Sequence, residues 1–228
     1  MKQPSVSQFV LSTLVVFLGH NPTASPASQP PSTPAATTRT ASLPHLQFFP
    51  ATREVHVECQ AIGVNAPLEF FCVVSGTAEH EAVLRTDARP SDIHTALLAI
   101  GMTPGSTLRY DPNTDKWLPP TGPKIDILVS WQQNGQNIQK PAAALIRNLR
   151  TKQPLPEIHW VFAGSRLLPD SAYAADLTGH VAALVNFESA TLDVPEIASN
   201  ANQSLTLEAN LEALPPPNTP VTMILKAR

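Results

Sequence analysis

The sequence lacks the patterns that mark several classes of protein. Its two cysteines, Cys59 and Cys72, are spaced unlike the Cys-x-x-Cys of a redox site. Only 14% of residues are charged, with 15 basic against 18 acidic and no basic run, which disfavours a nucleic-acid partner. Neither the Gly-x-Gly-x-x-Gly nor the phosphate-loop pattern occurs, so no nucleotide-binding signature is present. We therefore expect no cofactor.

Long hydrophobic runs are also scarce. The apolar stretch Phe9–Leu18 suits the core of a secretion signal and is too short to span a membrane, which needs about 20 residues. Small residues near Ala24 offer cleavage sites, and no cysteine that could carry a lipid precedes Cys59. We predict a signal peptide over residues 1–24 and an exported (periplasmic or extracellular), soluble mature protein with no integral membrane span. A short buried amino-terminal helix is the alternative.

The signal is followed by a change in composition. Residues 25–44 are rich in Pro, Ala, Thr and Ser and carry one charged residue, Arg39. Such a segment cannot bury enough apolar surface to offset the entropy of ordering it. We predict a disordered linker there and one folded domain over residues 45–228, long enough to form a sizeable core.

Strand patterns outnumber helix patterns in this domain. Helices are expected over residues 91–100, between Pro90 and Gly101, and over residues 142–149 after Pro141. Asn134-Gly135 is a strong hairpin turn. Strands are predicted at 54–58, 68–74, 124–131, 159–163, 180–187, 205–209 and 221–226. The expected fold class is α+β: a mixed, mainly antiparallel sheet with two or three helices in a single domain.

The two cysteines lie in what reads as a hairpin. The segments 54–62 and 68–74 flank a short turn-like stretch, and a two-residue loop at Asn65-Ala66 would place Cys59 directly opposite Cys72. Export permits a disulfide. Directly opposed cysteines bridge only with strain, so both a disulfide and a free buried pair are consistent with the sequence.

A first group of polar residues comprises Glu79, His80 and Glu81, with Asp92 and His94 downstream. Carboxylates and imidazoles together indicate a metal or acid–base site. Asp92 and His94 would lie about 200° apart around a helix, which separates their side chains. The alternative is that Ser91 and Asp92 cap the helix amino terminus and that His80 is an ordinary loop residue.

A second group follows the predicted strand 159–163. Ser165 comes after Gly164, but the nucleophile pattern Gly-x-Ser-x-Gly is not met. The plainer interpretation is a strand that ends in a Gly-Ser turn, with Trp160 in the core. Trp117, in a Pro/Gly-rich loop expected over residues 103–123, is either part of a binding surface or a residue that pins its own loop.

Several strings together resemble the YdjY-domain family of exported bacterial proteins. They are GTAEHEAVLRTDARPSDIHTALLAIGMTPG (76–105), PPTGP (119–123), HWVFAGSR (159–166) and PPPNTPVTMIL (215–225). The resemblance implies a layout of an export segment and one domain, with no established reaction, substrate or cofactor. It emphasises Glu79, His80, Glu81, Arg89, Pro90, Asp92, His94, Trp160, Gly164 and Ser165.

Two functions remain open. The first is a non-catalytic binding or interaction module of the cell envelope, whose partner is an unknown envelope protein or small ligand. The second is a metal-dependent or hydrolytic enzyme that uses His80, Glu81 and His94. No catalytic residue and no metal site is assigned. The ligand-binding candidates are His80, Glu81, Arg89, His94, Trp160 and Ser165, and the disulfide candidates are Cys59 and Cys72.

Overall fold

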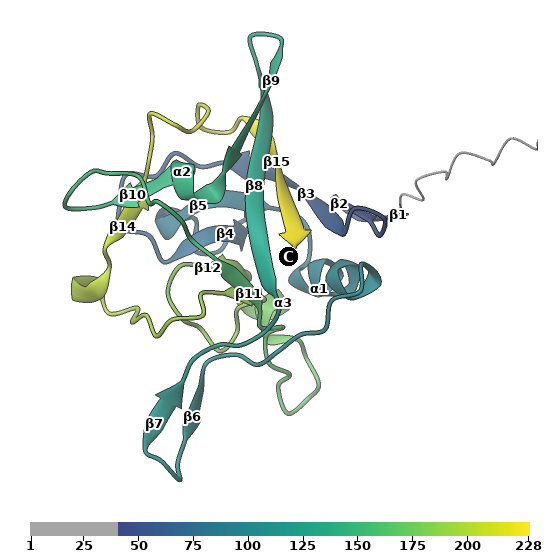
Figure 1. Cartoon of the computed structure of the whole chain (residues 1–228), viewed down its shortest axis with the longest axis vertical. Helices are drawn as coiled ribbons and strands as arrows, with labels where there is room; N and C mark the ends of the chain where they lie inside the picture. The colour runs from purple at the N-terminus through teal and green to yellow at the C-terminus, as the bar shows by residue number, and fades with distance from the viewer. Residues whose placement is uncertain (1–40) are drawn as a thin grey trace, which may run out of the picture. The chain divides into compact units, whose positions relative to one another are not determined.

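The computed structural model describes residues 41–228 (Figure 1). The predicted signal peptide and most of the predicted linker lie outside these residues. The first strand, β1 (Ala41–Leu43), pairs with β2 (Leu46–Phe49), which in turn pairs with β3 (Glu54–Ala61). Because β1 falls within the range assigned to the linker, the ordered domain begins earlier than residue 45.

Eight strands form a closed sheet in the order β3, β15, β8, β11, β13, β12, β4, β5 and back to β3. The new members are β4 (Phe70–Val74), β5 (Ala82–Thr86), β8 (Lys124–Gln133), β11 (Trp160–Phe162), β12 (His180–Ala183), β13 (Leu192–Asp193) and β15 (Pro220–Ala227). Six of the eight neighbouring pairs are antiparallel, and β4–β5 and β12–β13 are parallel. The mixed, mainly antiparallel sheet is confirmed. The α+β class is not, because this is a single β-rich domain.

Other strands extend this sheet or form separate ribbons. β9 (Gln136–Pro141) pairs with β8 through the predicted Asn134-Gly135 turn, whose residues both have positive φ, 52° and 75°. β10 (Ile146–Asn148) pairs with β14 (Leu207–Ala209). β6 (Arg109–Asp111) and β7 (Lys116–Leu118) form a two-stranded ribbon that projects from the closed sheet (Figure 1).

This ribbon replaces the structureless loop expected over residues 103–123. Trp117 stands opposite Tyr110 across the two strands, with ring centroids 5.6 Å apart, and both rings are about half exposed. An isolated two-stranded ribbon is marginally stable, and a cross-strand aromatic pair stabilises it. Trp117 therefore pins its own ribbon.

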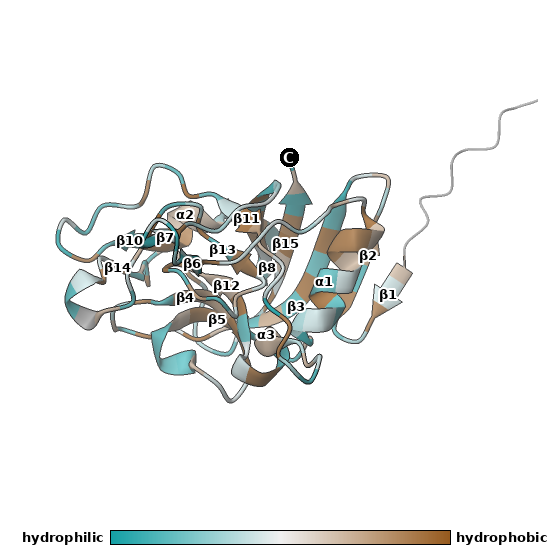
Figure 2. Ribbon diagram, turned by 90° about the horizontal axis from the view of Figure 1, so that it is seen from below, coloured by the Kyte–Doolittle hydropathy of each residue, from teal (hydrophilic) through white to brown (hydrophobic). Residues whose placement is uncertain are grey.

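Three α-helices accompany the strands. They are α1 (Pro90–Ala99), α2 (Ala142–Leu145) and α3 (Ala174–Thr178); two 3₁₀ turns, η1 (Glu79–Glu81) and η2 (Asn202–Ser204), are also present. The helix predicted over 91–100 is confirmed, with Pro90 at its first position. The helix predicted over 142–149 ends after one turn because residues 146–148 join β10. Figure 2 shows α1 beside β2 and β3.

The core lies on the buried face of the closed sheet. Along β3 the inward residues Val55, Val57 and Ala61 are fully buried, while Glu58 and Gln60 between them are exposed. Figure 2 shows this alternation as bands along the strand. The apolar face of α1, including Ile93 and Leu97, belongs to the same cluster. The outward side chains of these strands are consequently left to face solvent.

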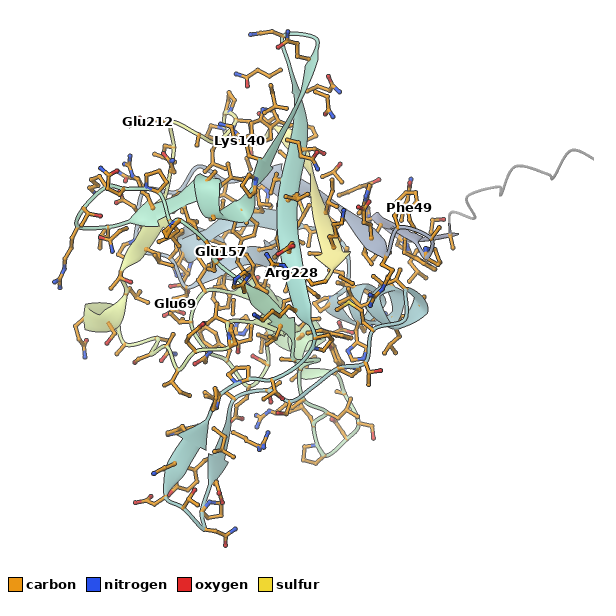
Figure 3. The ribbon with its side chains drawn as sticks, viewed as in Figure 1. Phe49, Glu69, Lys140, Glu157, Glu212 and Arg228 are labelled. Atoms are coloured by element: carbon orange, nitrogen blue, oxygen red, sulfur yellow. The ribbon has the colours of Figure 1, made fainter. Side chains whose placement is uncertain are left out.

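The carboxyl terminus is tied to the closed sheet by ion pairs. The Arg228 guanidinium lies 2.8 Å from a carboxylate oxygen of Asp126 on β8 and 3.3 Å from one of Glu157 (Figure 3). These contacts raise the pKa of Arg228. They keep the last residue of the chain against the end of β8.

The predicted hairpin that contains both cysteines is wrong. After β3 the chain leaves the sheet, and Pro67 and Leu68 contact β14 instead of turning back along β3. β5 separates β3 from β4, since it pairs with both.

Cys59 and Cys72 nevertheless meet inside the closed sheet as buried free thiols. Burial raises the pKa of Cys72 well above its ordinary value, and a hydrogen bond with the Cys59 thiol raises it further. Their disulfide stays a prediction. Thiol titration of the denatured protein, before and after reduction, tests it.

Candidate functional site

A cleft with a volume of about 390 Å³ is lined by α1, by residues 104–105 beyond its end, and by the segment that connects β11 to α3. Its walls include Pro104, Ala163 and Leu167, and the rings of His94 and Tyr173. Leu167 is 69% exposed and is one of several large apolar side chains that residues 41–228 leave exposed. The cleft brings together two of the predicted ligand-binding residues, His94 and Ser165.

His94 projects from α1 into this cleft. Its Nδ1 lies 3.0 Å from the Tyr173 hydroxyl, and its ring packs edge-on against Phe162 and Tyr173 with centroids 4.8 Å and 5.3 Å away. Burial lowers the pKa of His94, and a hydrogen bond to the backbone of Gly164 partly opposes that effect. Burial therefore favours the neutral imidazole, which is held by hydrogen bonds to protein groups.

Tyr173 extends this chain of hydrogen bonds. Its hydroxyl lies 3.3 Å from the Thr191 hydroxyl as well as beside His94. Burial raises the pKa of Tyr173 far above its ordinary range, so the phenol stays protonated. These hydrogen bonds connect α1 to the segment before α3 and to Thr191, the residue that precedes β13.

Ser165 is used by the fold. Its hydroxyl donates to the Ser189 carbonyl over 2.8 Å and accepts the Ala175 backbone N–H over 3.1 Å. Among residues 41–228, no His, Asp or Glu side chain hydrogen-bonds the Ser165 hydroxyl. The residue has φ 55°, so the Gly-Ser turn after β11 is sharp.

Trp160 lies in the core. It is 1% exposed, and its indole N–H donates to the Ala183 carbonyl over 2.7 Å. Its ring packs against Phe71 with centroids 5.4 Å apart. This is the plainer of the two interpretations of the segment, and it leaves Trp160 out of reach of a ligand.

Arg89 takes part in joining two helices. Its guanidinium pairs with Asp176 on α3 over 2.9 Å, and Asp176 also accepts the Ser91 backbone N–H and the Ser91 hydroxyl. No side chain within α1 caps its amino terminus. The cap expected from Ser91 or Asp92 is thus supplied by Asp176, which lies 85 residues beyond Ser91 in the sequence.

His80 and Glu81 lie apart from the cleft, on η1 between β4 and β5. The His80 imidazole is 79% exposed and stands 3.6 Å from the Glu81 carboxylate. Burial and the nearby Glu81 charge raise the pKa of Glu69, which is labelled in Figure 3. Across residues 41–228, no three His, Cys, Asp or Glu side chains lie close enough to hold a metal ion. The three-residue site with His94 is therefore not formed there.

Sequence reasoning missed most of the cleft. Tyr173 lies 79 residues from His94 in the sequence, and no spacing rule connects them. Gly164 carried the best signal, because it has φ 92° and a Cβ there would lie 2.6 Å from the Pro104 Cβ. A glycine can indicate a position where two segments approach closely, as they do here at the wall of the cleft.

These features define a single β-rich domain built on a closed sheet, with a partly apolar cleft beside its main helix. The chain belongs to the YdjY domain family, whose model matches residues 50–226. Comparison with curated proteins and with solved structures gives no match. None of the helices in residues 41–228 has the length and apolar character of a membrane span.

Proposed function

We propose that this chain is an exported, non-catalytic binding module of the cell envelope that holds an apolar group of its ligand in the cleft. The observation that carries the proposal is Leu167, a large apolar side chain exposed on the wall of a concave site. Small-molecule sites are concave and lined mainly by apolar side chains with a few polar groups, as this cleft is.

The polar groups of the cleft favour binding over catalysis. His94 and Tyr173 bond to each other, and the Ser165 hydroxyl donates to a backbone carbonyl. A nucleophile needs a base within hydrogen-bond reach to accept its proton. Ser165 instead hydrogen-bonds two backbone groups. The cleft therefore presents a concave apolar surface to a ligand and no activated nucleophile.

Ligand screening by NMR tests this proposal with small probes. Indole and benzyl alcohol, titrated into the ¹⁵N-labelled domain, are expected to shift the amides of Thr95, Gly105, Gly164 and Leu167. Thr95→Trp places a large side chain at the cleft and should weaken probe binding at least tenfold. Ala99→Trp, on the same helix and outside the cleft, should leave it unchanged.

Two results would contradict the proposal. One is that neither probe shifts the cleft amides at millimolar concentration. The other is that Thr95→Trp and Ala99→Trp bind the probes equally, which would place the binding elsewhere. Hydrolysis or metal-dependent turnover that is lost in the Thr95→Trp variant would instead indicate an enzyme.

A further inference from the structure

A second concave site lies on the outward face of the closed sheet. It has a volume of about 480 Å³, within the roughly 300–1,000 Å³ of small-molecule sites, and shares no residue with the cleft. Its lining comes from β3, β5, β8 and β15, with additions from β9 and the β1–β2 turn. We call it the outer groove. Because strands carry it, its side chains are held more rigidly than those of a loop site.

The strand register explains how its polar side chains converge. Successive residues of a strand point to opposite faces, so the inward core residues of β3 leave Glu58 and Gln60 on the outside. Thr222 on β15 stands opposite both Glu58 and Ser130, and Gln60 stands opposite Arg85. Hydroxyl, amide and carboxylate groups thereby form rows across neighbouring strands.

The charges of the outer groove disfavour an anionic ligand. Its one guanidinium, Arg85, is already bonded to Glu79, Gln60 and Asn218 over 2.7 Å, 2.8 Å and 2.7 Å. Glu58 is 72% exposed and contacts only His45, at 3.4 Å, among the ion pairs of residues 41–228. No Lys or Arg pairs with Asp87 in that part of the chain. The groove therefore presents carboxylates that no fixed cation neutralises.

These groups match the hydrogen bonds of a saccharide. A carboxylate accepts hydrogen bonds from more than one hydroxyl, and an amide both donates and accepts, as sugar hydroxyls do. Gln132 and Asn137 are exposed on the β8–β9 side, and Glu58 and Asp87 face them from the β3–β5 side. Pro220 adds apolar surface for the C–H face of a sugar ring.

We propose that the outer groove binds a saccharide chain that carries no negative charge. Glu58 and Asp87 accept the sugar hydroxyls, and Gln132 and Asn137 bond the neighbouring ring. The outer groove shares no lining residue with the cleft, so a ligand in one does not fill the other.

Calorimetry and NMR on the whole domain test the proposal with maltotriose and triacetylchitotriose as probes. We expect at least one of them to bind and to shift the amides of Glu58, Gln60, Ser130 and Gln132. Glu58→Gln and Asn137→Ala should each weaken binding at least fivefold. The matched controls Glu196→Gln and Gln136→Ala change exposed side chains outside the groove and should leave the affinity unchanged.

Three outcomes would overturn it. The first is that neither saccharide shifts the groove amides at about 10 mM, roughly tenfold above a Kd of about 1 mM. The second is that a saccharide binds equally well to both groove variants. The third is that spermidine binds and the saccharides do not, which would make the groove a cation site. Thr95→Trp is the separate reference for the cleft. Its effect on the binding of indole and benzyl alcohol tests the proposed function, and the saccharide titrations test the outer groove.

Discussion

At the scale of single residues, the partly buried His180 and the buried Asp193 have opposite effects on how stability depends on pH. His180 lies between Phe70 and Phe187, with centroids 4.5 Å and 4.8 Å away, and burial lowers its pKa to about 4. Asp193 accepts hydrogen bonds from Asn186, Phe187 and Val194, yet burial raises its pKa to about 7. The protonation of both groups therefore affects stability between about pH 4 and pH 7, and the two effects on the free energy of unfolding have opposite signs.

The signs follow from which state binds more protons. As the pH falls, His180 gains its proton in the unfolded chain before it does so in the native chain. The stability that His180 contributes is therefore present above about pH 6.5 and is lost as the pH falls toward 4. As the pH rises, Asp193 loses its proton in the unfolded chain before it does so in the native chain. The stability that Asp193 contributes is therefore present below about pH 4 and is lost as the pH rises toward 7.

Urea unfolding from pH 4 to pH 7 should separate the two effects. On acidification, wild type should lose about 2 kcal/mol more than His180→Gln, after allowance for the partial exposure of the ring. On raising the pH, wild type should lose about 3 kcal/mol more than Asp193→Asn. Parallel pH profiles for wild type and either variant would show that the group keeps its ordinary pKa.

At the scale of elements, α1 is positioned by α3. Asp176 accepts two hydrogen bonds from Ser91 and one from Arg89, and it stands where the α1 helix dipole favours a negative charge. A five-residue helix thus holds the start of a ten-residue one. This contact also fixes the wall of the cleft, since His94 lies one turn further along α1.

Asp176→Ala should lower the free energy of unfolding by about 1–2 kcal/mol, because it removes the cap of α1. Arg89→Ala should cost less than about 0.5 kcal/mol, because the guanidinium is 70% exposed and an exposed ion pair contributes little. Thermal or urea unfolding of the two variants measures the difference. Equal losses of stability in the two variants would mean that the Arg89–Asp176 ion pair, and not the cap of α1, stabilises the contact between the two helices.

The turn after β11 gives a second prediction at this scale. Gly164 and Gly101 have similar positive φ, 92° and 84°, but only Gly164 has a neighbour where a Cβ would stand. Gly101→Ala should cost about 1 kcal/mol from backbone strain alone. Gly164→Ala should cost about 2–3 kcal/mol, because it also displaces Pro104.

Urea unfolding compares these two variants, and indole titration shows whether the cleft survives. We expect Gly164→Ala, and not Gly101→Ala, to weaken indole binding. If both alanines destabilise the domain equally, the contact between Gly164 and Pro104 contributes nothing.

At the scale of the whole molecule, the export proposal rests on the amino-terminal segment. Phe9–Leu18 has the length of a signal core, and small residues follow it at the distance where cleavage occurs. Amino-terminal sequencing of protein from envelope and secreted fractions should find a start between about residues 20 and 30. Full-length protein confined to the cytoplasm would contradict export.

Features that depend on neighbours in sequence were predictable from the sequence. Asn134-Gly135 specified the β8–β9 hairpin, and Pro90 with Gly101 bounded α1. The alternation along β3 and β8 identified which side chains enter the core. Each of these depends on backbone preferences and periodicity within about ten residues, which the chain carries wherever it is placed.

The tertiary structure decided which segments meet. β3 pairs with β15 and with β5, although local patterns favoured a hairpin with β4, because the chain after Ala61 leaves to contact β14. Asp176 caps α1, and Tyr173 and Pro104 complete the cleft around His94. Such pairings are set by how one closed core buries all its apolar faces at once, and that competition among distant segments leaves no signal in any short stretch of sequence.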